Sequence, residues 1–147
     1  MDELEKCFAN KSLIKTTAEP QLAKKSLKRA HSVLKEVPKA LSIDLLELAE
    51  QRLYQAVFHA VKALLYNDGI KERSHYCVSL YFKEKYQKLT SEELLTLLDR
   101  LRDVRHESQY GLEAPELDKA QIESWLKEAL VLFKDIQKIL ENKKGSF

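Results

Sequence analysis

Hydrophobic residues recur along most of this chain at intervals of three and four positions, the spacing of an α-helix with one buried face. This spacing predicts five main helices, and no alternation of the kind found in β-strands persists long enough to matter. Short connections between consecutive helices favour antiparallel neighbours. The expected fold is therefore all-α, a compact antiparallel bundle of about five main helices.

Proline and hydroxyl-bearing residues mark the expected helix ends. Pro20 suits the first turn of a helix, and Pro38 is expected to end that helix. Ser74 suits an N-cap, and a capping-box pattern in which Thr90 reaches forward opens the next helix. The predicted segments are a brief helix within 2–15, main helices over about 20–37 and 44–67, a loop over 70–73, and main helices from about 74, 90 and 118.

The segment over residues 44–67 is predicted to be the central helix of the bundle. Two hydrophobic stripes cover most of its circumference, one containing Leu53 and the other containing Tyr54 and Phe58. A helix that is apolar on most of its circumference lies inside its bundle. A narrow polar strip remains, formed by Gln51, Gln55, His59 and Lys62.

Length and charge limit the classes of protein. With 147 residues, one domain over 1–147 is expected, with a core over about 20–142, a short N-terminal segment at 1–19 and a polar tail at 143–147. The formal net charge of +2 is too small for the whole surface to attract nucleic acid. Any basic surface that binds nucleic acid must therefore be confined to one part of the protein. Lys24, Lys25, Lys28 and Arg29 are interpreted as a solvated helix face, with contact to RNA as the minority alternative.

The cysteines and the N-terminus indicate a cytoplasmic protein without membrane partners. Cys7 and Cys77 are far apart in the sequence and fit no metal spacing, so free thiols in a reducing cytosol are expected. The first residues are acidic and lack the apolar run of a signal peptide. No segment approaches the length of a membrane span.

Metal and cofactor sites are not expected. Among the histidines, only His75 comes near a second ligand, Cys77, and residues two apart on a helix do not face each other. Three glycines cannot build a phosphate loop. Residues 75–86 contain several aromatic side chains, most of which are expected in the core. His75 and Tyr76, at the start of a helix, could reach a cleft.

Residues 100–110 carry the best candidate chemistry. Arg105 projects onto the helix line of Leu94, Leu98 and Leu101, so its guanidinium needs carboxylate, carbonyl or ligand partners. One interpretation is an internal salt bridge to a glutamate. The gathering of cations favours a site instead, whose members are Arg100, Arg102, Arg105, His106 and Tyr110.

An arginine and a histidine together can cut RNA without a metal ion. The histidine serves as general acid or base, and the arginine holds the phosphate while the 2′-hydroxyl attacks and a 2′,3′-cyclic phosphate forms. His106 stands near a helix C-terminus, where the helix dipole favours its protonated form. This chemistry is coherent, but the residues alone do not identify RNA cleavage as the function.

Three stretches of sequence stand out together: residues 54–65 followed by Gly69, residues 74–78, and the run Arg-His-Glu-Ser-Gln-Tyr-Gly at 105–111. Jointly they resemble the HEPN family (higher eukaryotes and prokaryotes nucleotide-binding domain), over roughly residues 20–142. The resemblance implies a helical bundle, frequently a homodimer, often encoded beside a small nucleotidyltransferase as a toxin–antitoxin pair. Active members are metal-independent RNases with an arginine, four to six intervening residues and a histidine.

The family motif fits this sequence in two registers. Arg100 and His106 have the right spacing, but on a continuous helix their side chains point apart. In the family a polar residue commonly follows the arginine. Arg105 followed by the polar His106 matches this start better, with Tyr110 in the position of the family's histidine. Tyrosine is a poor general base at neutral pH, so binding is expected ahead of cleavage.

Three functions remain open: a protein that binds a nucleotide, RNA phosphate or a nucleotidyltransferase partner, an active metal-independent RNase toxin, and a helical protein-interaction module without a ligand. The expected cleft is lined by Arg102, Arg105, His106 and Tyr110, with His75 as a neighbour from the start of the preceding helix. Arg102, Arg105 and His75 are the expected ligand-binding residues, and Arg105, His106 and Tyr110 the candidate catalytic residues.

Overall fold

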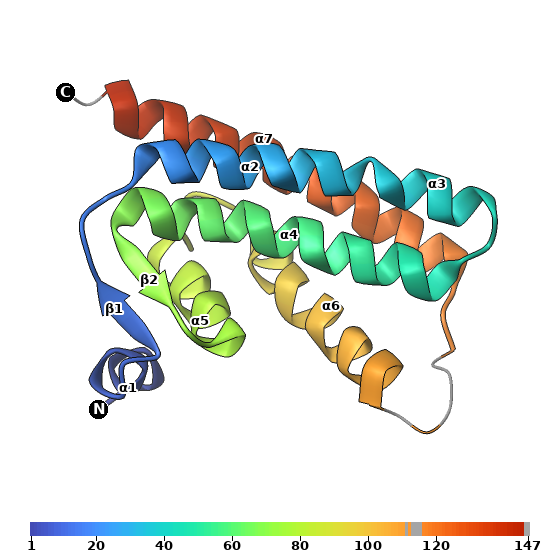
Figure 1. The fold of residues 1–147 in the computed structure, drawn as a ribbon, viewed down its shortest axis with the longest axis horizontal. Helices are drawn as coiled ribbons and strands as arrows, with labels where there is room; N and C mark the ends of the chain where they lie inside the picture. The colour runs from blue at the N-terminus through green and yellow to red at the C-terminus, as the bar shows by residue number, and fades with distance from the viewer. Residues whose placement is uncertain (111, 113–115, 146–147) are drawn as a thin grey trace.

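The computed structural model describes residues 1–110, 112 and 116–145, and helices dominate it. In chain order the elements are α1 (Glu3–Ala9), β1 (Leu13–Lys15), α2 (Pro20–Leu34), α3 (Glu36–Ser42), α4 (Leu46–Asp68), β2 (Ile70–Glu72), α5 (His75–Lys85), α6 (Glu92–Tyr110) and α7 (Lys119–Gly145). Figure 1 shows α4 and the consecutive helices α2 and α3 running lengthwise beside α7, while α5 and α6 cross this layer on one side. The all-α prediction is confirmed, apart from one small sheet.

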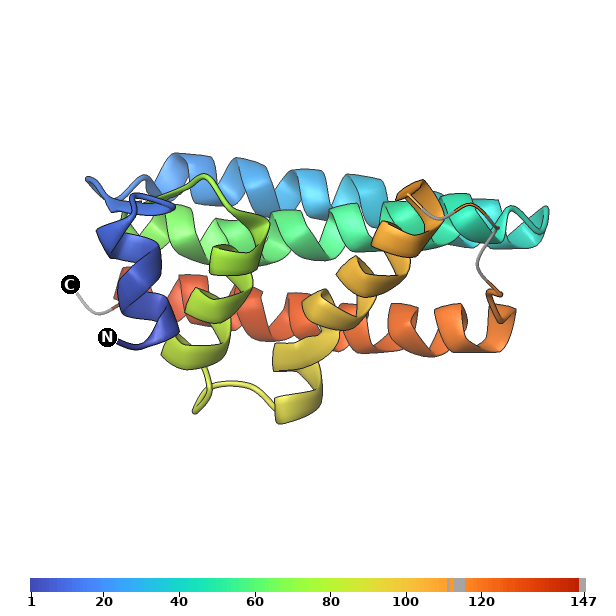
Figure 2. The same ribbon diagram turned by 90° about the horizontal axis from the view of Figure 1, so that it is seen from below.

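Helix α4 is the centre of the bundle, as its two hydrophobic stripes predict. It packs against α2, α3, α5, α6 and α7, and Figure 2 shows α2 and α7 on its two sides with α5 and α6 inclined across it. Leu53 is completely buried, and the predicted polar strip on α4 is half-buried. Burial of apolar surface around α4 therefore supplies the main stabilisation of the fold.

The prediction that Pro38 ends a helix is wrong. Helix α2 ends at Leu34, and α3 begins one residue further on, at Glu36. Pro38 lies in the first turn of α3, where a backbone N–H has no intrahelical acceptor to lose and where the fixed φ of proline fits a helix.

The start of α6 also differs from the predicted capping box by one residue. Ser91 caps the helix, because its hydroxyl accepts a hydrogen bond from the backbone N–H of Leu94 at 3.3 Å. The hydroxyl of Thr90 donates instead to Asp135 of α7 at 3.0 Å. The predicted N-cap of α5 is confirmed, since Ser74 Oγ accepts from the backbone N–H of Cys77 at 3.2 Å.

Residues 2–15 form more than the expected brief helix, and residues 70–73 are not simply a loop. After α1, strand β1 pairs antiparallel with β2, with Ile14 opposite Lys71. Both strands are three residues long, too short for any alternation to reveal them. Between α4 and β2, Gly69 has φ +74°, and a Cβ there would lie 2.5 Å from the carbonyl oxygen of Thr16. Only glycine permits this close crossing.

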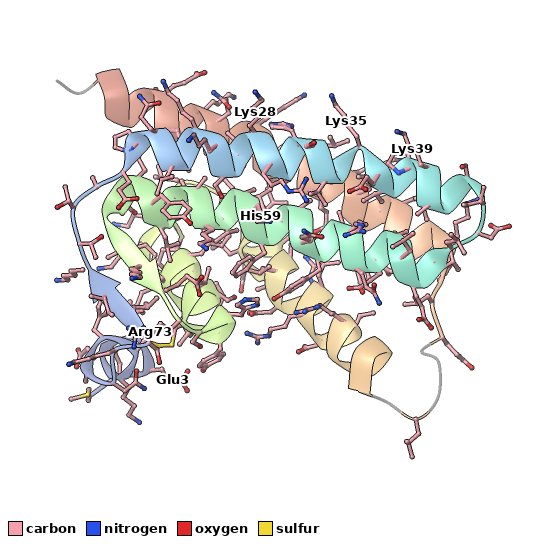
Figure 3. All side chains as sticks on the ribbon, in the orientation of Figure 1. Glu3, Lys28, Lys35, Lys39, His59 and Arg73 are labelled. Atoms are coloured by element: carbon pink, nitrogen blue, oxygen red, sulfur yellow. A yellow bond between two sulfur atoms is a disulfide. The ribbon has the colours of Figure 1, made fainter. Side chains whose placement is uncertain are left out.

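The prediction that Cys7 and Cys77 are free thiols is wrong. They form a disulfide between α1 and α5, with their Cα atoms 6.0 Å apart. The β1–β2 pairing carries α1 back to α5, and the 70 residues that separate the cysteines hide this proximity in the sequence. The disulfide appears in Figure 3 beside the labelled Glu3 and Arg73.

Besides the disulfide to α1, hydrogen bonds join α5 and its C-cap residue to the end of α4. The hydroxyl of Tyr81 donates to Asp68 Oδ2 at 3.0 Å, and the hydroxyl of Tyr86 donates to the same oxygen. Burial beside this carboxylate raises the pKa of both tyrosines. The C-terminal end of α4 is therefore tied to α5 by two hydrogen bonds.

No helix among the described residues is both long and apolar enough to cross a membrane.

Candidate functional site

Arg105 stands where α6 crosses α4. Leu94, Leu98 and Leu101 bury one face of α6, and Arg105 continues that face one turn further along. Its guanidinium carbon lies 4.8 Å from the ring centroid of Tyr54, the distance of a cation–π contact. The described residues form no salt bridge to Arg105. Within the described part of the chain Arg105 therefore makes no direct ion pair, although the buried carboxyl group of Glu50 is near enough to interact with its charge.

Arg102 lies one turn before Arg105 and contacts α5. Its guanidinium carbon is 5.5 Å from the ring centroid of Tyr76, and its Nη2 is 3.5 Å from Asp99 Oδ1. Asp99 also accepts hydrogen bonds from Ser79 Oγ at 2.5 Å and Lys83 Nζ at 2.6 Å. Because Asp99 is shared among three donors, the positive charge of Arg102 is only partly neutralised.

His75 joins α5 to the aromatic face of α4. Its Nδ1 is 2.8 Å from the hydroxyl oxygen of Tyr54, and its ring stacks on Phe58 with centroids 4.1 Å apart. Burial lowers the pKa of His75. The charge of Glu72 raises this pKa in part, and the charges of the nearby arginines lower it again. His75 is therefore a neutral imidazole at neutral pH, able to exchange a hydrogen bond or accept a proton.

We call Tyr54, Phe58, His75, Arg102 and Arg105 the cationic–aromatic cluster. Burial raises the pKa of Tyr54, although the charges of Arg105 and Arg102 and a hydrogen bond with Arg105 act in the opposite direction. Tyr54 therefore keeps its proton at neutral pH. The cluster combines two positive charges with neutral hydrogen-bonding groups, which suits an anionic ligand.

A buried carboxylate lies beside the cluster. Glu50 is fully buried on α4, and neither of its carboxylate oxygens has a hydrogen-bond partner among the described residues. Burial raises its pKa to about 7, against the opposing charge of Arg105. Buried polar groups are normally hydrogen-bonded, so Glu50 is the most unusual group of the core.

The sequence analysis did not select Glu50 or Tyr54 as site residues, although a signal for both was present. Tyr54 belongs to the second hydrophobic stripe of α4, and Glu50 lies one turn before it on the same face. A carboxylate within an apolar stripe calls for a partner in the same way as Arg105 does. Matching these two misplaced charges would have predicted that α4 and α6 meet here.

Arg100 lies away from the cluster. It forms a two-pronged contact with Glu128 of α7, with nitrogen–oxygen distances of 2.9 and 3.3 Å, and its Nη2 also donates to the carbonyl oxygen of Glu93 at 2.7 Å. Arg100 therefore links α6 to α7. This placement favours the register of the family motif that begins at Arg105.

The structure brings together three of the expected site residues, His75, Arg102 and Arg105. The side chains of His106 and Tyr110 lie outside the described residues, although the backbone of both belongs to α6. In the described part of the chain, no three His, Cys, Asp or Glu side chains are grouped to hold a metal ion.

Comparison with known proteins adds sequence relationships to this geometry. The model of the HEPN domain matches residues 23–142. A protein of Thermotoga maritima named UPF0332 protein is 28% identical over 119 residues, which make up 80% of this chain and 89% of that protein. The range matched by the family model runs from α2 to α7 and includes the whole cationic–aromatic cluster.

Proposed function

Because this chain belongs to the HEPN family, we propose that its cationic–aromatic cluster binds the phosphate group of a nucleotide or of RNA. The observation that carries the proposal is the state of Arg105, which faces an aromatic ring and has no salt bridge to a described residue. Arginine presents a planar fork of donors that fits a phosphate. Arg105 is the main anchor in this proposal, and Arg102 supplies the second charge.

Glu50 makes this binding depend on pH. When Glu50 is ionised, its carboxylate and the phosphate compete for the charge of Arg105, and when it is protonated Arg105 is available to the ligand. The pKa of Glu50 is about 7, so phosphate affinity is expected to rise as the pH falls through neutrality. His75 and Tyr54, which face the same region, stay neutral there because their pKa values are lowered and raised respectively.

Calorimetric titration with ribose 5-phosphate tests the proposal, because this probe carries a phosphate monoester without a base. Arg105→Gln should weaken its binding by about tenfold or more, the effect of losing a charge-assisted hydrogen bond. Arg100→Gln is the matched control, because it removes a guanidinium of the same helix that already pairs with Glu128. The proposal fails if the folded wild-type protein does not bind the probe, or if both variants bind it equally well.

A second candidate function is metal-independent RNA cleavage, favoured by the neutral imidazole of His75 beside two arginines. In this alternative Arg105 holds the scissile phosphate, while His106 and Tyr110 take part in proton transfer. Cleavage of labelled total RNA should then persist in EDTA and fall strongly in His106→Ala or Tyr110→Phe. Binding of RNA without cleavage products would leave the first proposal in place and reject this one.

We also propose that the protein forms a homodimer and works with a small nucleotidyltransferase as a toxin–antitoxin pair. The family supports both expectations, and a two-fold axis beside α6 would double the local positive charge. Light scattering should give about twice the 17.1 kDa mass of one chain. A nucleotidyltransferase encoded beside this gene should co-purify with the protein. If neither a partner nor a phosphate ligand binds, the remaining alternative is a helical module in which the arginines are structural.

A further inference from the structure

Tyr76 is an exposed aromatic residue at the edge of the cationic–aromatic cluster. Tyr76 is 46% exposed, whereas Tyr54 and Phe58, the aromatic residues that α4 contributes to the cluster, are 3% and 8% exposed. Its ring lies 5.5 Å from the guanidinium carbon of Arg102. The site therefore presents an exposed aromatic ring beside the positive charge of Arg102, and this pairing of ring and cation is the one that nucleic-acid sites use to hold a base and its phosphate.

Although Tyr76 is exposed, two contacts hold its side chain and a disulfide holds the backbone next to it. Its hydroxyl donates a hydrogen bond to Glu3 of α1, and the next residue, Cys77, is joined to α1 by the disulfide. Arg102, which contacts the ring, is itself attached to Asp99. A side chain that is already ordered loses little conformational entropy when a ligand contacts it.

Arg102 connects this ring with the proposed phosphate anchor. It contacts Tyr76 and lies three residues before Arg105 on α6, a separation that places two side chains next to each other on a helix. In a nucleotide the ribose holds the phosphate and the base a few bonds apart. A phosphate on Arg105 therefore brings the base of the same nucleotide, or of the adjacent one in RNA, towards Tyr76.

We propose that Tyr76 is a stacking platform for the nucleobase of the ligand, so that the site takes a nucleoside phosphate rather than any phosphate. The inference rests on the proposed phosphate binding at Arg105. Every base has a π-face, and stacking on an aromatic side chain does not depend on base sequence. The α1 segment gains a role here, because Glu3 fixes the orientation of the ring.

Calorimetric titrations with AMP and ribose 5-phosphate test this inference, because the two probes share the phosphate and the ribose and differ in the base. The wild-type protein should bind AMP about tenfold more tightly, the gain expected from stacking one base. Tyr76→Leu should lower the affinity for AMP to that for ribose 5-phosphate. Tyr76→Phe keeps the ring and should retain most of the preference.

Tyr66→Leu is the matched control. Tyr66 also carries a cation on its ring, with Lys62 Nζ 5.2 Å from the centroid, but it stands at the C-terminal end of α4 and belongs to no part of the cluster. This variant should bind AMP as the wild-type protein does. Equal affinities of the wild-type protein for the two probes, or an unchanged AMP preference in Tyr76→Leu, would overturn the inference while leaving phosphate binding intact. Failure of both probes to bind would instead reject the proposed function itself.

Discussion

Two carboxylates on α4 have opposite environments. Asp68, at the C-terminal end of the helix, accepts hydrogen bonds from the hydroxyls of Tyr81 and Tyr86. Glu50, near the other end, is fully buried and has no hydrogen-bond partner for either oxygen among the described residues. One helix therefore carries a carboxylate that is satisfied by its surroundings and another that is not.

The difference fits a structural role for Asp68 and, under the proposed function, a role in ligand binding for Glu50. Hydrogen bonds to Asp68 stabilise its charge and tie α4 to α5, which is sufficient reason for that residue. The burial of Glu50 costs stability, and among the described residues the charge of Arg105 offsets part of that cost. Unsatisfied buried charges are typical of sites whose purpose is not stability. The comparison can be tested with four substitutions.

Leu53→Asp should have the largest effect. Leu53 is fully buried on the other hydrophobic stripe of α4, so an aspartate there would be a second buried carboxylate, without the charge of Arg105 beside it. The expected loss of stability exceeds about 4 kcal/mol, because an unpaired buried charge adds to the cost of the lost leucine packing. Thermal unfolding followed by circular dichroism measures it, with Leu53→Ala as the cavity control. An unchanged melting temperature would contradict the central position of α4.

Glu50→Gln should stabilise the protein in a pH-dependent way. The pKa of Glu50 is about 7 when folded and 4.5 when unfolded. The folded state therefore binds the proton of Glu50 more tightly than the unfolded state does. This proton binding stabilises the wild-type protein fully below pH 4.5, and the stabilisation is lost as the pH rises through 7. At pH 8 the variant should exceed the wild-type protein by up to about 3 kcal/mol. Urea unfolding at pH 5 and pH 8 measures the difference, which should shrink at pH 5.

The same variant separates stability from function. Removal of the competing carboxylate should abolish the rise in ribose 5-phosphate affinity between pH 8 and pH 6. A stability gain of equal size at both pH values would show that the charge of Glu50 is not the cause.

Tyr86→Phe should destabilise the protein by about 1–3 kcal/mol, because it removes a hydroxyl that donates a hydrogen bond to Asp68. The ring of Tyr86 is 2% exposed, and phenylalanine preserves its packing. Urea unfolding gives the loss, and calorimetry should show unchanged binding of ribose 5-phosphate. A weakened affinity would mean that the Asp68 region is coupled to the site, against the distinction drawn above.

Arg100→Gln should have the smallest effect. Its ion pair with Glu128 is partly exposed, with side-chain exposures of 37% and 21%, so its contribution is below about 1 kcal/mol. Stability and phosphate binding should both stay close to those of the wild-type protein. Binding as weak as that of Arg105→Gln would restore the register of the motif that begins at Arg100.

The sequence predicted those parts of the fold that depend on local periodicity. The two stripes around Leu53 and Tyr54 placed α4 at the centre, and the leucine line of α6 placed Arg105 against the bundle. Contacts between distant segments could not be predicted in this way. The β1–β2 pairing, the Cys7–Cys77 disulfide and the hydroxyl contact between Thr90 and Asp135 all join residues far apart in sequence.

The candidate site shows the same division. Periodicity selected Arg102 and Arg105, and the start of α5 drew attention to His75, which lies against Tyr54. Periodicity could not separate these residues from Arg100, because the ion pair that takes Arg100 away from the cluster is made with Glu128 of α7. Glu50 is predictable from the sequence in the same way as Arg105, because it is an acidic residue that interrupts an apolar stripe.

The disulfide divides the chain into a closed ring, residues 7–77, and an open arm that contains α6 and α7. The ring holds Glu50, Tyr54 and His75, and the arm holds both arginines of the cluster. Only non-covalent packing joins the arm to the ring beyond residue 77. Detachment of α6 would therefore remove the arginines while the covalently closed half persists. A ligand that contacts both halves would hold the arm against the ring, and we expect it to slow amide hydrogen exchange in α6 more than in α4.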